Sequence, residues 1–144
     1  MKNKWNLIVI VLALASTMVG NAQCNQKNKC VQNLAKYTLL KSYNIDLPER
    51  KGQMDHPDEA SYPAILSKGV RYRLAGCPNK MESKTDMVYA LYLGNDLIST
   101  NRSKSGKIYA ALEFVCNKTG VYYLKAYFVE GAKGCGSASL SMAK

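Results

Sequence analysis

The single histidine of the chain, His56, is the first candidate for chemistry. It lies among the carboxylates of Asp55, Asp58 and Glu59 in a polar segment that carries two prolines. Imidazole and carboxylate groups bind Zn²⁺ or Ca²⁺, but their spacing here matches no zinc or calcium motif. We therefore expect a solvated acidic loop and no metal, with a Ca²⁺-stabilised carbohydrate-binding module using Asp55, Asp58 and Glu59 as an alternative.

The sequence offers little else for catalysis. A Ser–His or Cys–His nucleophile pair would have to use His56, the only histidine. The segment Ser105-Gly106-Lys107 lacks the upstream glycine of a phosphate-binding loop. The chain is therefore expected not to be an enzyme, and no cofactor is expected.

The cysteines indicate an oxidising compartment. No two of them form a CxxC pair, so a thioredoxin-like redox site or a zinc knuckle is not indicated. Two disulfides and one spare thiol are expected. The favoured pairs are Cys77 with Cys135 and Cys30 with Cys116, with Cys24 left over. A bond between Cys24 and Cys30 is the simple competitor.

Tyrosine is the residue type in excess, with ten tyrosines against two phenylalanines and one tryptophan. Aromatic side chains on a sheet face stack on sugars or anchor protein interfaces. Strand alternation puts tyrosines on one face with Lys125, and two arginines on the polar face of an earlier strand. The candidate binding surface consists of Tyr109, Tyr123, Tyr127, Lys125, Arg71 and Arg73. One alternative is that another sheet or loop covers these side chains. The sequence also leaves open whether Arg71 and Arg73 lie near the tyrosines or on the opposite sheet.

Residues 107–129 are the stretch on which this surface depends. Two runs of strand-forming residues flank the turn residues Asn117 to Gly120, which predicts a β-hairpin. Alternation places successive side chains on opposite sides of a strand. The predicted core faces carry Ile108, Ala110, Leu112 and Phe114 in the first run and Tyr122, Leu124, Ala126 and Phe128 in the second.

Further strands are predicted along the rest of the chain. Their ranges are 37–47, 61–66, 70–75, 86–93, 97–100 and 135–142. The 86–93 run is apolar on both faces, so it is expected to be a central, covered strand. About eight strands with regularly spaced turn residues predict an all-β fold, an antiparallel β-sandwich or jelly roll.

Several of these runs resemble a known family. The runs LSKGVRYRL, DMVYALYLGNDLIST and TGVYYLKAYF, followed by a short closing strand, resemble the bacterial pre-peptidase C-terminal domain and its small exported relatives. The matching positions are Gly69, Asp86, Leu91, Tyr92, Leu93, Gly120, Tyr122 and Tyr123. The resemblance covers residues 61–142 and implies an eight-stranded jelly roll that is not catalytic. This chain differs in standing alone, without a protease, and in its added cysteines.

The amino terminus predicts export. A short basic segment precedes an apolar run that is too short for a comfortable membrane span, and small residues precede a cleavage point after Ala22. Residues 1–22 are thus predicted to be a signal peptide with a cleaved helix, 23–36 a flexible lead-in and 37–144 the β-sandwich domain. The protein is expected to be secreted, periplasmic or on the cell surface, without a membrane span in the mature chain. A lipoprotein anchored at Cys24 and an uncleaved anchor are the alternatives.

The charge balance is basic. The formal net charge is +10, and removing Lys2 and Lys4 with the signal leaves +8. Such a protein is attracted to anionic surfaces, although nucleic acid is not an expected partner of an exported protein. The predicted function is that of an exported, non-catalytic accessory module that binds a protein or glycan at the bacterial envelope. The alternative is a disulfide-stabilised structural envelope protein without a dedicated ligand.

Overall fold

The computed structural model describes residues 35–49, 59–79, 83 and 85–144. The predicted signal peptide, most of the lead-in, Cys24, Cys30 and the His56 segment with Asp55 and Asp58 lie outside the described residues. All regular structure within the described ranges is β-strand, apart from the short 3-10 helix η2 at Val129–Gly131.

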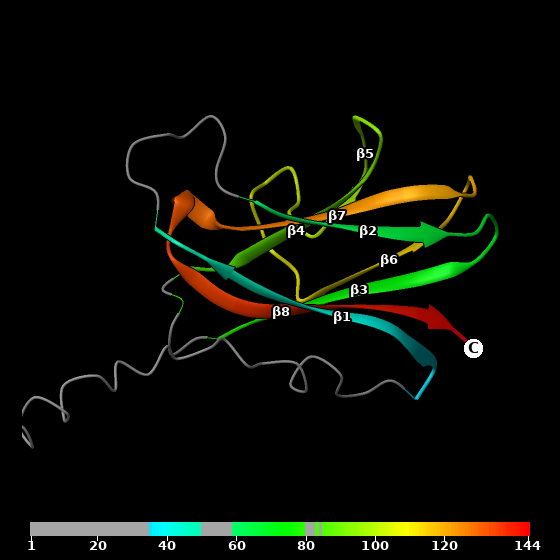
Figure 1. Cartoon of the computed structure of the whole chain (residues 1–144), viewed down its shortest axis with the longest axis horizontal. Helices are drawn as coiled ribbons and strands as arrows, with labels where there is room; N and C mark the ends of the chain where they lie inside the picture. The colour runs from blue at the N-terminus through cyan, green and yellow to red at the C-terminus, as the bar shows by residue number, and fades with distance from the viewer. Residues whose placement is uncertain (1–34, 50–58, 80–82, 84) are drawn as a thin grey trace, which may run out of the picture.

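Eight strands form two four-stranded antiparallel sheets that pack face to face (Figure 1). The first sheet has the order β1-β8-β3-β6 and the second the order β2-β7-β4-β5. The strands are β1 Tyr37–Leu47, β2 Ala60–Leu66, β3 Arg71–Pro78, β4 Met87–Leu93, β5 Asp96–Thr100, β6 Ala111–Val115, β7 Gly120–Phe128 and β8 Gly134–Ala143. The predicted all-β sandwich is confirmed, and each predicted strand corresponds to one of these.

The core lies between the sheets, and alternation predicts which side chains enter it. Every second residue of β7 is buried, beginning with Tyr122 and ending with Phe128. On β1, Tyr43 and Ile45 are buried while Leu39 is exposed. The pairing of β1 with β8 shifts between Leu39 and Lys41, so the alternation is interrupted where Lys41 interrupts the apolar pattern.

The hairpin predicted for residues 107–129 is wrong. β6 pairs with β3 in the first sheet, whereas β7 pairs with β2 and β4 in the second. The chain therefore crosses between the layers at residues 116–119, and β6 begins only at Ala111. The physical reason is that β6 and β7 each have one apolar face. Both faces are buried if the two strands face each other across the core, and both are equally buried if the strands pair side by side in one sheet.

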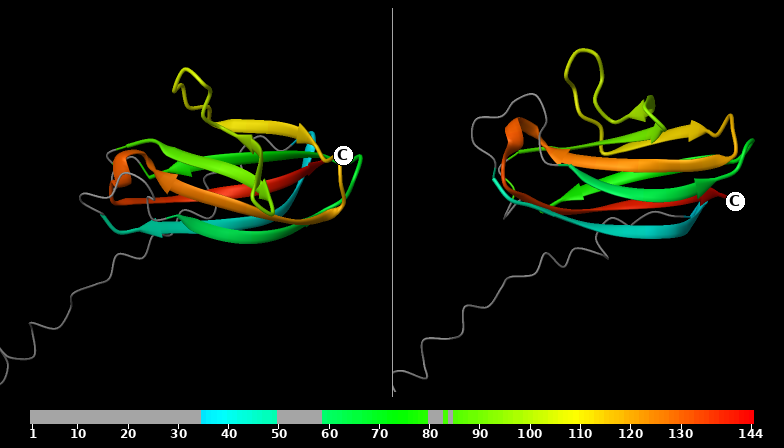
Figure 2. Two further views of the ribbon diagram at one scale, coloured as in Figure 1. Left: turned by 90° about the horizontal axis from the view of Figure 1, so that it is seen from above. Right: turned by 45° about the horizontal axis from the view of Figure 1, so that its top comes forward.

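A second crossing stabilises the first. The β2–β3 connection also passes from the second sheet to the first, and the two connections are hydrogen-bonded to each other. The amide of Gly69 donates to the carbonyl of Cys116 at 2.7 Å, and the amide of Lys68 donates to Thr119 Oγ1 at 2.9 Å. Both crossings lie at the right-hand end of the sandwich in Figure 1. The connection from β5 to β6, residues 101–110, instead stands off the body (Figure 2).

Candidate functional site

The six residues of the predicted binding surface do not lie together. Tyr123, Lys125 and Tyr127 share the outer face of β7 in the second sheet, as alternation predicts. Arg71 and Arg73 lie on β3 in the first sheet, and Tyr109 lies in the connection that precedes β6. The surface therefore divides among the outer face of each sheet and one projecting connection.

A row of large side chains crosses the outer face of the second sheet around Tyr123. Pro63 of β2 is opposite Tyr123, Tyr123 is opposite Tyr92 of β4, and Tyr92 is opposite Leu97 of β5. Directly opposed side chains on one sheet face are in contact range. The four side chains thus form a continuous row over all four strands.

A second pair extends this row toward the end of the sheet. Ile65 of β2 is opposite Val121 of β7. Ile65 is 78% exposed and Val121 47%, while Leu97 is 53% and Tyr123 41% exposed. We call the six side chains Pro63, Ile65, Tyr92, Leu97, Val121 and Tyr123 the exposed sheet face. Contiguous apolar surface of this kind marks interaction sites in soluble proteins.

Lys125 borders the exposed sheet face and is held in place. Its Nζ lies 2.5 Å from Glu59 Oε1 and 5.0 Å from the centroid of the Tyr92 ring. The hydrogen bond to Glu59 raises the pKa of Lys125 above its ordinary value. Lys125 therefore supplies a fixed, mostly neutralised polar rim to the face.

The arginines belong to a different surface. Arg73 is opposite Glu113 of β6, and its guanidinium lies 5.5 Å from the ring centroid of Tyr37. The hydrogen bond to Glu113 raises the pKa of Tyr37. Arg71 and Glu113 also line a shallow depression with Phe114 and Val115. This surface is mixed in charge and faces away from Tyr123.

The outer faces of the two sheets are treated differently. On β8, Ser137, Ser139 and Ser141 alternate with core residues, yet all three are buried. On the second sheet, the outward residues Ile65, Leu97 and Val121 are exposed, whereas Val88 of β4 is buried. The serines of β8 are therefore covered, while part of the outer face of the second sheet exposes apolar side chains to solvent.

The buried side-chain amide of Asn101 joins the two ends of the projecting connection. Asn101 is 2% exposed, and its Nδ2 donates to the carbonyls of Met87 and Tyr109 at 3.1 and 3.0 Å. Its Oδ1 accepts from the amide of Tyr89 at 2.9 Å. The segments Asn101-Arg102-Ser103 and Asn117-Lys118-Thr119 both match a glycosylation sequon, and the sequence predicts that they are turn residues. The burial of Asn101 gives the first of these asparagines a structural role.

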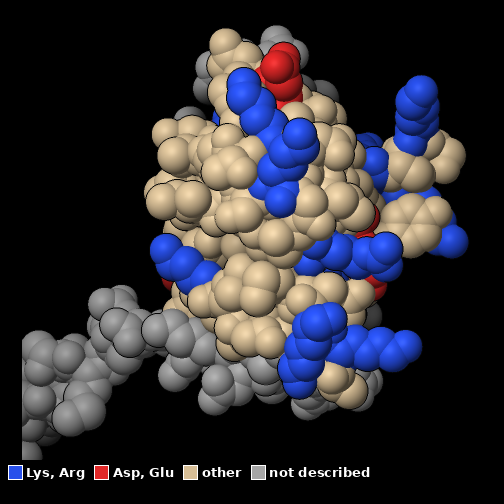
Figure 3. Space-filling view, turned by 90° about the vertical axis from the view of Figure 1, so that its right-hand side faces the viewer, with Lys and Arg blue, Asp and Glu red and all other residues tan. Residues whose placement is uncertain are grey.

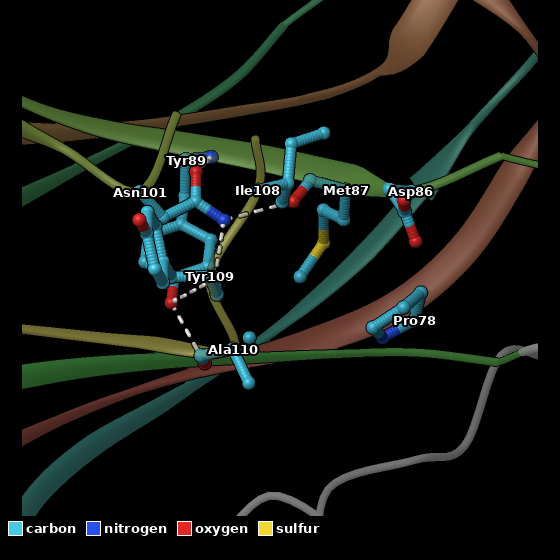
Figure 4. A pocket seen from close by; sticks show the side chains of 9 residues that line it. Pro78, Asp86, Met87, Tyr89, Asn101, Ile108, Tyr109 and Ala110 are labelled. Carbon is cyan, nitrogen blue, oxygen red and sulfur yellow. Dashed lines mark hydrogen bonds between the residues drawn. The ribbon is translucent and has the colours of Figure 1, made fainter. Parts of the chain in front are cut away.

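A cleft of about 190 Å³ opens between the sheets beside Asn101 (Figure 4). Met87 and Tyr89 of β4 point into it, and Asp86 lies at its edge. Tyr89 spans the layers and donates to the carbonyl of Ala110 at 2.8 Å, and burial raises its pKa. Gly76 allows this, because a Cβ there would lie 2.5 Å from the Tyr89 ring. The cleft offers apolar surface, and its lining residues do not include a nucleophile paired with a general base.

The structure contradicts one of the two predicted disulfides. Cys116 is free and buried, so its predicted disulfide with Cys30 is wrong. Its thiol instead donates to the carbonyl of Lys118 at 3.1 Å, in the crossing before β7. Cys77 and Cys135 are disulfide-bonded, but their bond to each other stays a prediction. Cys24, the predicted free thiol, is outside the described residues.

Neither a metal centre nor a membrane-spanning helix is found within the described ranges. They contain no group of three potential ligands among His, Cys, Asp and Glu. Of the carboxylates considered for Ca²⁺, only Glu59 is described, and it binds Lys125. No helix in the described part of the chain is long and apolar enough to cross a membrane.

Sequence reasoning missed most of the exposed sheet face. Tyr92 belongs to a strand that the sequence predicts to be covered, and the predicted surface does not include Pro63, Ile65, Val121 or Leu97. The available signal was the proline, because a proline inside a strand indicates an edge strand. Ile65 is two residues from Pro63, and Val121 is two residues from Tyr123, so alternation places them on the same face.

No protein-family model matches the chain, and no curated protein matches it in sequence. Solved structures are similar in fold. The pre-peptidase C-terminal domain of a collagenase from Bacillus anthracis has 16% identity and a TM-score of 0.48, covering 71% of this chain and 89% of that one. A periplasmic inhibitor of g-type lysozyme from Aeromonas hydrophila has 10% identity and a TM-score of 0.49, covering 74% and 86%. The first is a domain of the kind that the sequence resembles, and both likenesses concern the fold.

Proposed function

We propose that this protein is an exported, non-catalytic module that binds a protein partner through the exposed sheet face. The observation that carries the proposal is the row Pro63–Tyr123–Tyr92–Leu97, extended by Ile65 and Val121, on a sheet face open to solvent. Apolar side chains in this position lower the solubility of a monomer, and burying them against a partner stabilises a complex.

The composition of the face favours a protein over a glycan. Glycan platforms depend on aromatic rings, whereas the most exposed residue here is Ile65, and Val121 and Leu97 are also aliphatic. A face with central tyrosines, aliphatic neighbours and a charged rim is typical of protein interfaces. The Lys125–Glu59 pair supplies that rim.

Two features of the chain support export. The amino-terminal segment has the pattern of a signal peptide, and Cys77 and Cys135 are disulfide-bonded, a state that persists in oxidising compartments. The mass of the exported protein distinguishes cleavage after Ala22 from lipid attachment at Cys24.

The test is affinity capture from the envelope fraction of the producing cell, followed by mass spectrometry. The variant Ile65→Ser with Tyr123→Ser replaces the most exposed residue of the exposed sheet face and the tyrosine in its row. The matched control, Arg71→Ser with Arg73→Ser, changes two outward positions of the other sheet. We expect the first variant to lose the captured protein and the control to retain it.

Two results would contradict the proposal. Equal capture by the wild-type protein and the Ile65/Tyr123 variant would show that the face binds nothing, as for a purely structural envelope protein. Retention on purified envelope glycan that depends on Tyr123 but not on Ile65 would identify a glycan as the ligand instead.

A further inference from the structure

The connection between β5 and β6 carries a second, independent feature that concerns charge. We call residues 101–110 the projecting loop. It contains Arg102, Lys104 and Lys107, all exposed, and no acidic residue occurs in the sequence between Asp96 and Glu113. None of these three cations forms an ion pair with any residue that the structure describes.

The base of the projecting loop is fixed. The amide of Tyr109 donates to the carbonyl of Asn101 at 2.9 Å, and Arg102 forms a β-bridge with Ile108. The buried side chain of Asn101 ties this base to β4 through Met87 and Tyr89. The loop therefore leaves the sandwich as a closed, anchored structure.

The tip is also ordered by its own hydrogen bonds. The amide of Gly106 donates to the carbonyl of Ser103 at 2.9 Å, and the amide of Ser103 donates to the carbonyl of Lys107 at 2.8 Å. The hydroxyl of Ser103 accepts from the Lys107 amide at 3.1 Å. Gly106 has φ +86°, a conformation that glycine adopts without strain. A ligand would thus meet cations whose backbone positions are already fixed.

The shape of the projecting loop limits what it can bind. Both views in Figure 2 show it standing off the sandwich. Figure 3 shows Lys and Arg side chains on the part of the molecule that projects to the right, and they predominate over Asp and Glu on this side. The cleft at its base is lined by Asn101, Ile108 and Tyr109 but by none of the three cations. The cations therefore lie along a convex loop, with Arg102 at its base and Lys104 and Lys107 toward its tip, and such a loop cannot enclose a small anion.

We propose that the projecting loop binds the phosphate headgroups of an anionic lipid surface. A convex, acid-free tip can reach a flat array of phosphates without contact between the surface and the rest of the sandwich. Each cation near such a surface adds to the attraction, and salt screens it. The ammonium of Lys107 lies 5.0 Å from the ring centroid of Tyr109, and a tyrosine at the loop base suits the headgroup region. This binding is separate from that of the exposed sheet face.

The test uses the full chain, purified after expression, and sedimentation with vesicles. Vesicles of phosphatidylglycerol with phosphatidylcholine are compared with vesicles of phosphatidylcholine alone. The loop variant is Arg102→Gln with Lys104→Gln and Lys107→Gln. The control, Lys68→Gln with Lys118→Gln and Lys133→Gln, removes the same charge from other exposed positions. Because all proteins share one amino terminus, differences between them report on the replaced residues.

We expect the loop variant to partition about 100-fold less strongly onto anionic vesicles than the wild-type protein at low salt, since three cations are removed. The control should lose clearly less, and 0.5 M salt should release the wild-type protein. Gly106→Ala keeps every charge but strains the tip, so it should weaken binding by a smaller factor. Unfolding by urea, followed in parallel, shows that each variant is folded.

Four outcomes would overturn the proposal. The first is no preference of the wild-type protein for phosphatidylglycerol, and the second is an equal loss in the loop variant and the control. Tighter binding to soluble polyphosphate than to vesicles would assign the loop to a phosphate polymer. Tighter binding to polyglutamate would assign it to an acidic protein.

Discussion

The side chain of Asn101 satisfies three backbone groups at once, the amide of Tyr89 and the carbonyls of Met87 and Tyr109. Replacing it with alanine would leave the amide of Tyr89 and the carbonyls of Met87 and Tyr109 without these partners. We predict that Asn101→Ala lowers the free energy of unfolding by about 2–4 kcal/mol, because buried groups lose hydrogen bonds without gaining water. Urea unfolding followed by circular dichroism measures this loss.

The second sequon supplies the control for this prediction. Asn117 is exposed in the crossing before β7, so Asn117→Ala should change the free energy of unfolding by less than about 0.5 kcal/mol. Equal effects of the two substitutions would contradict the role assigned to Asn101. The sequence marks both asparagines as turn residues, and it does not distinguish the buried one because burial depends on how the loop returns to β4.

Tyr89 makes stability depend on alkaline pH. Burial raises the pKa of Tyr89 above its ordinary value of 10.0, so the folded state holds the phenol proton more tightly than the unfolded state. This stabilisation is complete below about pH 10, and it is lost as the pH rises above 10 because the unfolded chain ionises first. The loss from this group has a limiting slope of about 1.4 kcal/mol per pH unit.

The variant Tyr89→Phe isolates this contribution. It should be less stable at neutral pH because the carbonyl of Ala110 loses the phenol donor and keeps only the amide of Gly76. Between pH 10 and 11.5, however, its free energy of unfolding should fall less steeply than that of the wild-type protein. Identical slopes for wild type and Tyr89→Phe would contradict the assignment of the alkaline loss to Tyr89.

At the scale of the element, β7 places two adjacent tyrosines in opposite environments. Tyr122 is 2% exposed and faces the core, whereas Tyr123 faces solvent. We predict that Tyr122→Ser lowers the free energy of unfolding by about 3–5 kcal/mol, as for other large-to-small core substitutions. Tyr123→Ser should cost less than about 1 kcal/mol, and chemical denaturation of the two variants measures both values.

This pair also distinguishes the two functional alternatives. If the exposed sheet face were covered in solution as part of a structural protein, Tyr123→Ser would destabilise the fold nearly as much as Tyr122→Ser. A small stability effect combined with loss of partner capture is expected only for a binding face. The same strand thus provides the variant and its control.

The strands could be predicted because the alternation of apolar and polar residues indicates which face of a strand is buried. The bounds predicted for β1 agree with the structure, and the core side of β7 follows directly from the spacing of Tyr122, Leu124, Ala126 and Phe128. The same alternation does not indicate which of the two sheets a strand joins. β6 and β7 have the same pattern whether they pair or face each other across the core, so the hairpin and the crossing are equivalent from the sequence.

At the scale of the whole molecule, the residues of the predicted binding surface are divided between the two sheets for the same reason. Tyr123, Lys125 and Tyr127 share a face because they share a strand, and this is a local property. Arg71 and Arg73 lie on the opposite side of the sandwich because β3 belongs to the first sheet. The neighbours of Tyr123, namely Pro63 and Tyr92, come from strands far apart in sequence. Only the pairing of β2, β7 and β4 brings them together.

The order of the first sheet makes folding depend on the last strand. β8 lies between β1 and β3, and it pairs with both along most of its length. It contributes Ala138 and Leu140 to the core as well as the disulfide-bonded Cys135. Without β8, the first and third strands lose their common neighbour, and the inner face of the second sheet loses part of the surface that covers it.

We therefore predict that a chain ending at Lys133 does not fold, because losing a central strand removes more stabilisation than the 5–15 kcal/mol typical of a whole domain. Near-ultraviolet circular dichroism and a urea titration without a cooperative transition would show this. Removing Lys144 alone takes away its hydrogen bonds to the carbonyls of Lys36 and Ala35 at the exposed end of the strand, and it should leave the transition nearly unchanged. A cooperative transition in the chain ending at Lys133 would mean that β1 and β3 are stable without the strand between them, which the observed sheet order does not allow.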